Sequence, residues 1–347
     1  MKVAVVLPVK DGAAYLPDCL AHVREQTHQP VELIIVVAPS SDETREMALE
    51  LGEEGASILD NQAGDRGSAI NRALEVTDAD AIAMVDAQAL LAADYLETAI
   101  TVLQQSKAAV VGGPMRPVGR GPVGEAMAAC LGSPFAIGDS QFHFSGGARD
   151  ADSVYLGVFR AEVFRAVGRY NPALLRTEDD DMNARVRQHG FRIHLDPAIR
   201  SDYRCRGDLR SIWRQYFGYG FWKVALLAVR PTALRIRHLI PAAFVVAVVV
   251  SAVVSLLTGL PAFGALAAAW LLASVVFAYV APARSVRGRM LFPVVAFTIH
   301  LAYGSGFLLG LASLPSNLRS IRAGAETAAP TGTVPASTRS DERSTGQ

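Results

Sequence analysis

The sequence predicts an α/β domain with a mostly parallel sheet, followed by transmembrane helices toward the C-terminus. Two observations support this fold class. Over residues 1–207, short and continuously apolar strands alternate with helical patterns, as in a parallel sheet that is covered on both faces. Over residues 231–315, three apolar segments are each long enough to cross a hydrocarbon core of about 30 Å. The chain is therefore expected to combine a globular domain with a membrane region.

The elements of the globular domain follow from the apolar runs and their boundaries. Strands are expected at residues 3–9, 31–37, 57–60, 81–86, 108–111, 154–159, 191–195 and 199–203. Helices are expected at residues 13–26, 41–51, 68–76, 94–105, 162–167 and 178–189. The second of these helices would have Ser40 or Ser41 as its N-cap. Residues 112–147, which hold many glycines and prolines, are expected to be irregular.

Ligands of parallel sheets bind beyond the carboxyl ends of the strands. One crevice should therefore be lined by four such ends, at residues 8–11, 38–41, 60–67 and 86–88.

A helix is expected at residues 209–229, between the globular domain and the apolar segments. It carries aromatic side chains on much of its surface, together with the basic residues Arg210, Arg214 and Lys223. Aromatic rings and basic groups of this kind are suited to the headgroup level of a bilayer. Residues 208–230 are therefore predicted to form an interfacial amphipathic helix that docks on anionic lipid.

The three apolar segments cover residues 239–257, 263–281 and 290–314. Soluble helices are rarely apolar on every face for this length. Basic residues cluster before the first segment and after the second, which predicts a multi-pass plasma-membrane protein with a cytoplasmic first domain. A full third crossing would put Arg319 and Arg322 outside, which leaves a weak charge signal, a re-entrant helix or a fourth crossing. Residues 316–347 are predicted to form a disordered tail.

The residues that carry chemistry are acidic. Four consecutive carboxylates, Glu178 to Asp181, begin a predicted helix, and Asp86 ends an apolar strand. This pattern suits a metal-assisted transfer from an activated phosphate ester, in which one carboxylate holds the cation and another takes a proton. Carboxylates in a first helical turn also complement the helix dipole, with Thr177 as a suitable N-cap. Some of the four are therefore expected to serve only the helix, and Asp86 has the same alternative role as a cap.

The order of several short motifs resembles that of family 2 glycosyltransferases with a GT-A fold. These motifs lie at residues 7–10, 34–37 with 40–44, 64–71, 85–88 and 177–179. A second set, at residues 133–135, 154–160, 176–183 and 214–223, resembles the succinoglycan-biosynthesis (ExoA-like) branch. The resemblance implies an inverting enzyme that moves a hexose from a nucleotide sugar, with UDP expected, to a polyprenyl-diphosphate-linked glycan in exopolysaccharide synthesis. The expected partners are this donor, this acceptor and the membrane, with no nucleic acid.

The resemblance also assigns roles to the acidic residues. Asp179 matches the catalytic base, which takes a proton from the acceptor hydroxyl, and crowding by its neighbours would raise its pKa. Asp86 begins the Asp-x-Asp motif, which implies a Mg²⁺ or Mn²⁺ ion that bridges the donor diphosphate. The second acidic position of that motif is Gln88 here. An amide oxygen can coordinate but brings no charge, so Asp86 is the only charged metal ligand expected.

The nucleotide and acceptor sites are implied by further positions. The acidic residue that commonly follows the second strand is replaced by Ala38, so base recognition is expected either from the backbone near Pro8 and Val9 or from Asp65. Arg66 and Lys10 are expected to contact the donor phosphates. The alternative for each is a solvent-exposed loop residue with no ligand.

The acceptor is expected to lie beside Glu178, Gln215 and Trp222. Polymerising relatives carry a Gln-x-x-Arg-Trp motif, and no Arg precedes Trp222, which predicts the addition of one sugar per encounter. Trp222 also suits an interfacial anchor.

Two alternatives come from other functional classes. A sugar-1-phosphate nucleotidyltransferase would need a Gly-rich, basic loop after the first strand, where this chain has residues 8–11 with no glycine. It would also have no need of three apolar segments. A non-catalytic membrane scaffold with a degenerate transferase domain is suggested by Ala38 and Gln88. Turnover of a nucleotide sugar by the purified protein separates this scaffold from an enzyme.

Overall fold

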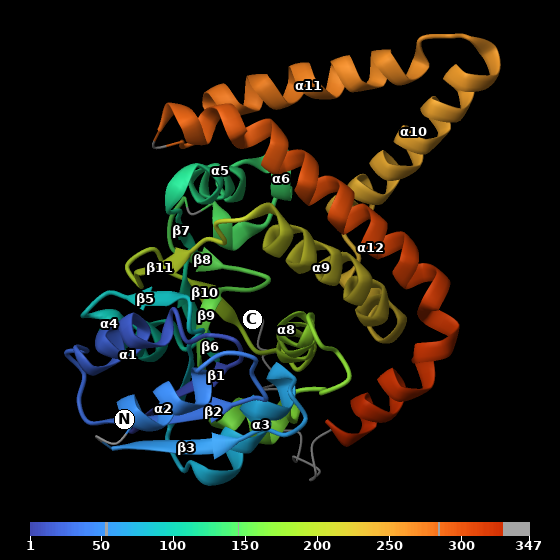
Figure 1. Ribbon diagram of the computed structural model, residues 1–347. Coiled ribbons are helices and arrows are strands. Elements are labelled where there is room, and N and C mark those ends of the chain that lie inside the picture. Colours follow the sequence, from blue (N-terminus) through green and yellow to red (C-terminus); the bar gives the residue numbers. More distant parts are fainter. Residues whose placement is uncertain (53–54, 145, 284, 329–347) are drawn as a thin grey trace, which may run out of the picture.

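The computed structural model describes residues 1–52, 55–144, 146–283 and 285–328. An eight-stranded sheet forms the centre of the N-terminal domain (Figure 1). Its strands, in spatial order, are β3 (Ala56–Asp60), β2 (Val31–Val37), β1 (Val3–Val9), β4 (Ala81–Met84), β9 (Tyr155–Arg160), β6 (Val110–Gly113), β10 (Ile193–Leu195) and β8 (Arg149–Asp150). Strand β9 runs antiparallel to both of its neighbours, and β8 runs antiparallel to β10. The remaining pairs are parallel, which confirms the predicted fold class.

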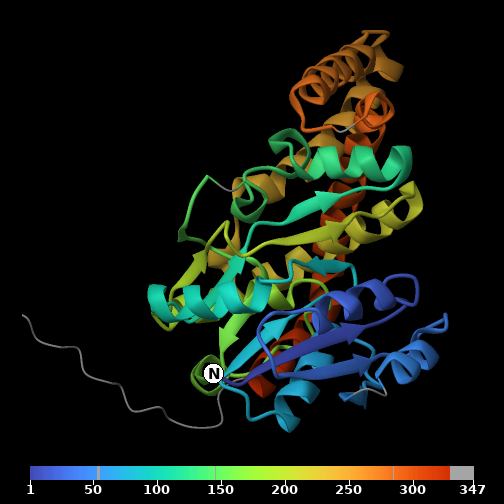
Figure 2. The same cartoon turned by 90° about the vertical axis from the view of Figure 1, so that its left-hand side faces the viewer.

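The sheet is buried on both faces, as its continuous apolar strands predict. Along β1, Val5 and Leu7 face one core and Ala4 and Val6 face the other. The first core is covered by α1 (Leu16–Arg24), α2 (Thr44–Gly52) and α4 (Tyr95–Ser106). The second is covered by α3 (Arg66–Val76), α7 (Glu162–Val167) and α8 (Glu178–Gln188). Figure 2 shows these helices on the two sides of the sheet.

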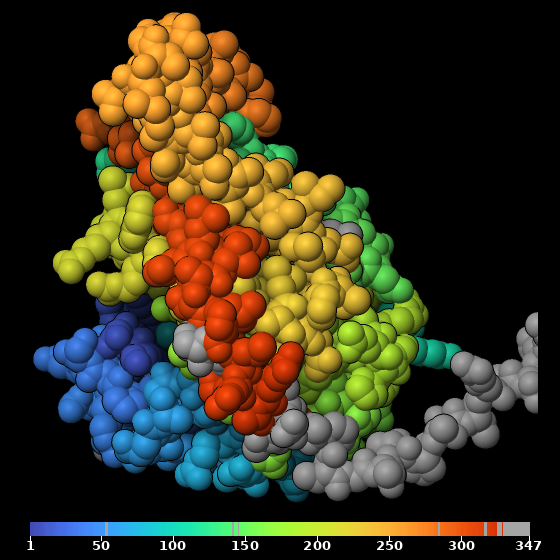
Figure 3. Space-filling view, turned by 90° about the vertical axis from the view of Figure 1, so that its right-hand side faces the viewer, coloured from blue at the N-terminus to red at the C-terminus, as the bar shows by residue number. Residues whose placement is uncertain are grey.

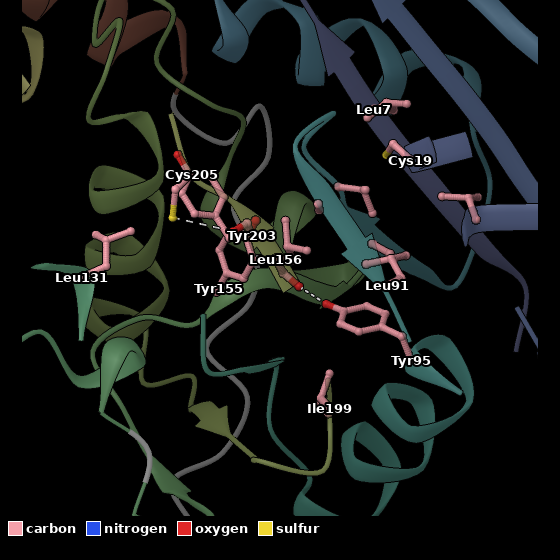
Figure 4. Close-up of a cluster of buried hydrophobic side chains, with 14 of the residues drawn as sticks. Leu7, Cys19, Leu91, Tyr95, Leu131, Tyr155, Leu156, Ile199, Tyr203 and Cys205 are labelled. Carbon is pink, nitrogen blue, oxygen red and sulfur yellow. Dashed lines mark hydrogen bonds between the residues drawn. The ribbon is translucent and has the colours of Figure 1, made fainter. Parts of the chain in front are cut away.

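A second, three-stranded sheet extends the first core. It consists of β5 (Ala89–Leu91), β11 (Ser201–Arg204) and β7 (Arg116–Val118). Buried tyrosines hold this region together (Figure 4). The Tyr95 hydroxyl of α4 donates to the carbonyl of Leu156 on β9, and between the two sheets the rings of Tyr155 on β9 and Tyr203 on β11 meet edge to face at 6.0 Å. This packing holds β11, and the chain that follows it, beside the end of β4.

Residues 112–147 are more regular than predicted. They contain α5 (Gly121–Leu131), α6 (Pro134–Ile137) and a short 3₁₀ turn. Pro122 lies in the first turn of α5, where a proline costs no helical hydrogen bond. The apolar residues of α5, including Met127 and Leu131, are buried. The expectation of an irregular segment was wrong because Gly and Pro at the start of α5 concealed a buried helix.

Four long helices form the C-terminal part: α9 (Leu209–Val229), α10 (Ile236–Thr258), α11 (Ala262–Val280) and α12 (Val286–Thr327). By length and composition, α10, α11 and residues 286–315 of α12 are able to cross a membrane. The three helices differ in how much of their apolar stretch is buried inside the protein. The buried share is 6% for α10 and 11% for α11, against 50% for α12. Helices α10 and α11 project from the domain as a hairpin, whereas α12 runs past α9 (Figure 1).

Helix α12 is packed against the N-terminal domain at both ends. Before its first turn, Ser285 donates a hydrogen bond to Glu125 of α5. In its middle, a Cβ at Gly306 would lie 2.1 Å from the carbonyl oxygen of Phe217, so only glycine permits this approach to α9. Near its end, Asn171 donates to the carbonyl of Ile321 at 3.4 Å. The helix therefore lies along the domain.

This packing corrects the predicted tail. Residues 316–327 continue α12 instead of forming a disordered segment, and residues 329–347 lie outside the described residues. The physical reason is that Ile321 is buried against Leu174 and Leu226, so an otherwise polar stretch has an apolar anchor.

Candidate active site

Four of the predicted site residues meet at the carboxyl edge of the sheet. Asp86 follows β4, Arg66 begins α3, and Glu178 and Asp179 begin α8. Nη1 of Arg66 lies 2.8 Å from both carboxylate oxygens of Asp179 and 3.5 Å from Oε1 of Glu178. Its Nη2 lies 3.2 Å from Oδ1 of Asp86. The guanidinium thus bridges three carboxylates at the carboxyl edge of the sheet.

The two leading carboxylates of α8 differ in their surroundings. The Glu178 side chain is 7% exposed and that of Asp179 is 54% exposed. Burial raises the pKa of Glu178, and the charge of Asp179 adds to this effect. Desolvation also raises the pKa of Asp179, against the opposing effect of Arg66. Asp179 is the carboxylate that an acceptor can reach, whereas Glu178 lies below it with Oε2 buried and without a hydrogen bond among the described residues.

The other two carboxylates of the acidic run connect α8 to the end of α9. Asp180 pairs with Lys223, and Asp181 pairs with Arg185 at 2.8 Å and Arg230 at 2.9 Å. Some of the four were predicted to serve only the helix that they begin. Asp180 instead pairs with α9, whereas Asp181 pairs within α8, with Arg185, and also with Arg230 directly after α9.

Thr177 also differs from its prediction. Its side chain does not cap α8; the hydroxyl donates to the carbonyl of Trp222 at 3.3 Å instead. Lys223 was expected to face anionic lipid, and that expectation is wrong because Lys223 is 9% exposed and pairs with Asp180.

The nucleotide side of the crevice is built from strand ends and one helix cap. Asp65 caps α3, since its Oδ1 accepts from the backbone nitrogen of Ser68 at 2.7 Å. The carbonyl of Val9 accepts from the backbone nitrogen of Ala38 at 2.9 Å, next to Pro8. Lys10 is exposed, and its Nζ points toward Gly64.

The predicted caps of α2 have other partners. Ser41 donates from its backbone nitrogen to Asp11 at 2.7 Å, and Ser40 accepts from the backbone nitrogen of Asp11 at 3.1 Å. Helix α2 begins only at Thr44, whose backbone nitrogen lies 3.2 Å from Oδ1 of Asp42. Asp11, near the end of the first predicted strand, and Asp42, in the loop before α2, were not predicted to organise this edge.

The predicted acceptor residues of α9 have different neighbours. Gln215 accepts from Nε of Arg206 at 3.0 Å and donates to the Tyr219 hydroxyl at 2.9 Å. Trp222 is half-buried and packs with Leu174 in a small apolar cluster. Gln215 therefore lies in a polar network near the crevice, and Trp222 packs beside the segment that leads into α8.

The acidic edge of the sheet is suited to a divalent cation that binds together with a phosphate group. Within the described ranges, no three His, Cys, Asp or Glu side chains are grouped to hold a metal ion. Asp86 is 39% exposed at the crevice, and Gln88 follows two residues later. Mg²⁺ commonly uses one or two carboxylates and completes its coordination with phosphate oxygens. This donor set fits that mode of binding, with Asp86 as the charged ligand.

Two cavities of about 500 Å³ lie outside the acidic cluster. The first lies beside α3 and is lined by residues that include Asp60, Asn61 and Ser68. The second lies between α5, β7 and the end of α11. Figure 3 shows a hollow between the blue N-terminal part and the start of α9. In the cluster itself, the Arg66 guanidinium lies between Asp86 and Asp179.

Comparison with known proteins identifies this architecture. Residues 4–141 match the family model "Glycosyl transferase family 2". The chain is 28% identical over 222 residues to succinoglycan biosynthesis protein ExoA of Rhizobium meliloti (strain 1021), covering 62% of this chain and 67% of that protein. It is 22% identical over 254 residues to a dolichyl N-acetyl-alpha-D-glucosaminyl phosphate 3-beta-D-2,3-diacetamido-2,3-dideoxy-beta-D-glucuronosyltransferase of Methanococcus voltae, covering 70% and 78%.

A solved structure has the same fold. The mannosyltransferase PcManGT of Pyrobaculum calidifontis, in complex with GDP-Man and Mn²⁺, superposes with a TM-score of 0.59 at 19% identity, covering 88% of this chain and 87% of that one. Its similarity supports the fold, and the family match supports the class of enzyme. Residues 4–141 therefore match a family 2 glycosyltransferase domain, and the architecture of the chain is GT-A-like.

Proposed function

We propose that the protein is an inverting enzyme that transfers a hexose from a UDP-sugar to a lipid-linked oligosaccharide, with Asp179 as the base. The observation that carries this proposal is the bridge from Asp179 through Arg66 to Asp86. It supports a site in which an exposed carboxylate serves as the base, Arg66 binds phosphate and Asp86 binds the metal ion. The relative in R. meliloti acts in succinoglycan biosynthesis, and this supports a role in exopolysaccharide or cell-envelope glycan synthesis.

The chemistry is a single displacement at the anomeric carbon. The acceptor oxygen attacks this carbon from the face opposite the leaving group, and its proton passes to Asp179. The bond between the anomeric carbon and the phosphate oxygen breaks, and its electron pair leaves with the nucleoside diphosphate. Arg66 has donors for the phosphate oxygens, so donor binding would exchange its carboxylate partners for phosphate. This exchange frees Asp179 to accept the proton.

The donor-binding edge combines backbone and side-chain groups. Pro8 and Val9 would border the nucleobase of the donor, and Asp65 would hold the start of α3. Lys10 would reach the donor phosphates. A divalent cation, Mg²⁺ or Mn²⁺, would neutralise charge on the leaving diphosphate when bound. Asp86 would hold it, with Gln88 as a neutral neighbour. PcManGT was solved with Mn²⁺, which supports this assignment.

The membrane would bring the acceptor to the site by lateral diffusion. Helices α10 and α11 project as a largely unburied hairpin and would cross the plasma membrane twice. Helix α12 contacts the catalytic domain at both ends and would remain on its side, which we propose is cytoplasmic. Arg319 and Arg322 would then also lie inside, which removes the conflict in the charge pattern.

The alternatives have less support. A degenerate scaffold would have no need of an acidic cluster held around Arg66, and a nucleotidyltransferase would have no need of the α10–α11 hairpin. The test is to incubate the purified full-length protein in lipid nanodiscs with UDP-hexoses, a divalent cation and lipid-linked oligosaccharides. We expect transfer by the wild type and at least about a hundredfold slower transfer by Asp179→Asn. Absence of both transfer and donor hydrolysis across the donor set, with the folded wild type, would support the scaffold.

A further inference from the structure

Two arginines lie on the α9 side of the crevice without an acidic partner. They are Arg176, directly before α8, and Arg206, between β11 and α9. Neither forms an ion pair with any residue in the part of the chain that the structure describes. Neighbouring arginines behave differently, since Arg204 pairs with Asp18 and Arg230 with Asp181. The positive charges of Arg176 and Arg206 are therefore not balanced by an ion pair with a described residue.

The two side chains lie beside one face of α9. Arg206 is half-buried and donates from Nε to Gln215, which leaves its two terminal nitrogens available. Arg176 lies across Gly218, where a Cβ would stand 3.4 Å from its Nε. Gln215, Gly218 and Tyr219 share a helical face because they are three or four residues apart.

Tyr219 connects this pair to the acidic cluster. Its hydroxyl accepts a hydrogen bond from Gln215 at 2.9 Å. Burial raises the pKa of Tyr219, and the charges of Arg176 and Arg206 oppose that shift while Asp86 reinforces it. Arg176, Arg206 and Asp86 therefore all lie close enough to the Tyr219 hydroxyl to affect its pKa. The crevice has an acidic half around Asp179 and a basic half around Tyr219.

We propose that Arg176 and Arg206 bind the diphosphate of the lipid-linked acceptor. This proposal rests on the proposed function and adds to it a site for the charged group that joins glycan to lipid. Guanidinium groups form paired, charge-assisted hydrogen bonds with phosphate oxygens. The short glycan would extend from this basic half to Asp179, where its terminal hydroxyl reacts.

The position of the pair favours the acceptor diphosphate over that of the donor. Arg66 and Lys10, on the strand side, are the residues proposed for the donor phosphates. Arg176 and Arg206 lie beside α9 instead, whose other face packs on α12 and which leads into the membrane hairpin. A lipid diphosphate that approaches from the bilayer meets this side first.

The test compares Arg176→Gln, Arg206→Gln and the double variant with matched controls. Arg210→Gln and Arg214→Gln remove the same charge from exposed positions near the start of the same helix. Full-length proteins in neutral nanodiscs are titrated with farnesyl diphosphate in the presence of saturating UDP and Mg²⁺, which occupies the donor site. We expect the double variant to bind about tenfold or more weakly, since charge-assisted hydrogen bonds to phosphate are lost. The controls should bind as the wild type does.

Steady-state kinetics provide a second test of the proposal. In the double variant, KM for the lipid-linked acceptor should rise by about tenfold or more, while KM for the UDP-sugar and hydrolysis without acceptor stay unchanged. A soluble glycan acceptor without phosphate should show no difference between the double variant and the wild type.

Three results would overturn the proposal. Displacement of the probe by UDP would assign the arginines to the donor, as would a rise in donor KM. Equal binding by the double variant and the controls would make them solvated surface residues. Because probe binding needs no sugar transfer, it decides the site even where the proposed reaction fails.

Discussion

Lys223 of α9 forms an ion pair with Asp180 of α8, the residue next to the proposed base Asp179. Desolvation would raise the pKa of Asp180, but Lys223 outweighs it and the pKa is lowered. Thr177 and Asp181 add a hydrogen bond to Trp222 and an ion pair to Arg230. The helix that carries the base is therefore held by the helix that leads into the membrane region. Membrane attachment and the position of Asp179 are structurally linked.

Loss of Lys223 should lower turnover without removing a group that touches the substrate. Lys223→Met leaves Asp180 unpaired and loosens the first turn of α8. Because a displacement of about 1 Å can cost about a hundredfold in rate, a partial loosening should lower kcat by about tenfold. Donor KM should change little, and Lys223→Arg should recover most of the activity. The measurement is steady-state kinetics on the full-length protein.

The matched control removes an ion pair that joins a different helix of the membrane region to the same domain. Arg237 pairs with Asp139 at 2.7 Å, so Arg237→Gln breaks a contact between α10 and the same domain. It should leave kcat near the wild-type value. Equal losses in Lys223→Met and Arg237→Gln would mean that only general attachment of the helices matters.

Asp179→Asn should remove catalysis while keeping the fold. The change preserves shape and eliminates basicity, so kcat should fall by at least about a hundredfold, as general acid–base catalysis is typically worth 10²–10⁴. Binding of UDP, measured by calorimetry, should stay near normal. Asp180→Asn serves as the comparison, because it alters the neighbouring carboxylate and should cost less. An Asp179→Asn enzyme with most of its activity would place the base elsewhere.

The dependence of the rate on pH should reflect the raised pKa of Asp179. Its pKa is raised, so the base becomes protonated at a higher pH than an ordinary carboxyl group. The rate should therefore fall as the pH is lowered through this raised pKa, and kcat/KM reports it for the free enzyme. Arg66 opposes the shift, so Arg66→Gln should move the acidic limb to a higher pH. An unmoved limb would show that another group titrates.

The metal role depends on a single charged ligand. Asp86→Ala should abolish activity, since it removes the only assigned carboxylate. Gln88→Asp should keep activity and lower the concentration of Mg²⁺ or Mn²⁺ needed for half-maximal rate, because a second negative charge strengthens cation binding. The check is a metal titration of each variant after treatment with a chelator. Full activity of the wild type in excess chelator would exclude this role.

The sequence was sufficient for the strands because their pattern is local. Residues 3–9 and 31–37 are apolar on both faces, which predicts a covered parallel sheet, and Asp86 and Arg66 converge because strand ends share one edge. The partners of Lys223 and Thr177 were not predictable, since each ion pair or hydrogen bond joins segments 43 or 45 residues apart. Only the fold brings them together.

The same limit applies to α12. An apolar segment has a similar composition whether its neighbours are lipid or protein, and residues 286–315 are able to cross a membrane by length and composition. The sequence did not predict the close contact of Gly306 with Phe217, which depends on how α9 is placed. The glycines of α12 were a signal that the segment packs on another helix.

The last prediction concerns how often the chain crosses the membrane. If only α10 and α11 cross, Leu260 between them lies on the far side, and Arg322 near the end of α12 lies with the catalytic domain. Leu260→Cys should react with an impermeant maleimide on intact cells, whereas Arg322→Cys should react only after permeabilisation, like Arg210→Cys in the control. The native Cys19, Cys130 and Cys205 are buried and should stay unlabelled in the folded protein. Labelling of Arg322→Cys from outside would instead mean that α12 crosses, and its contacts with α5 and Asn171 would then not persist in the membrane.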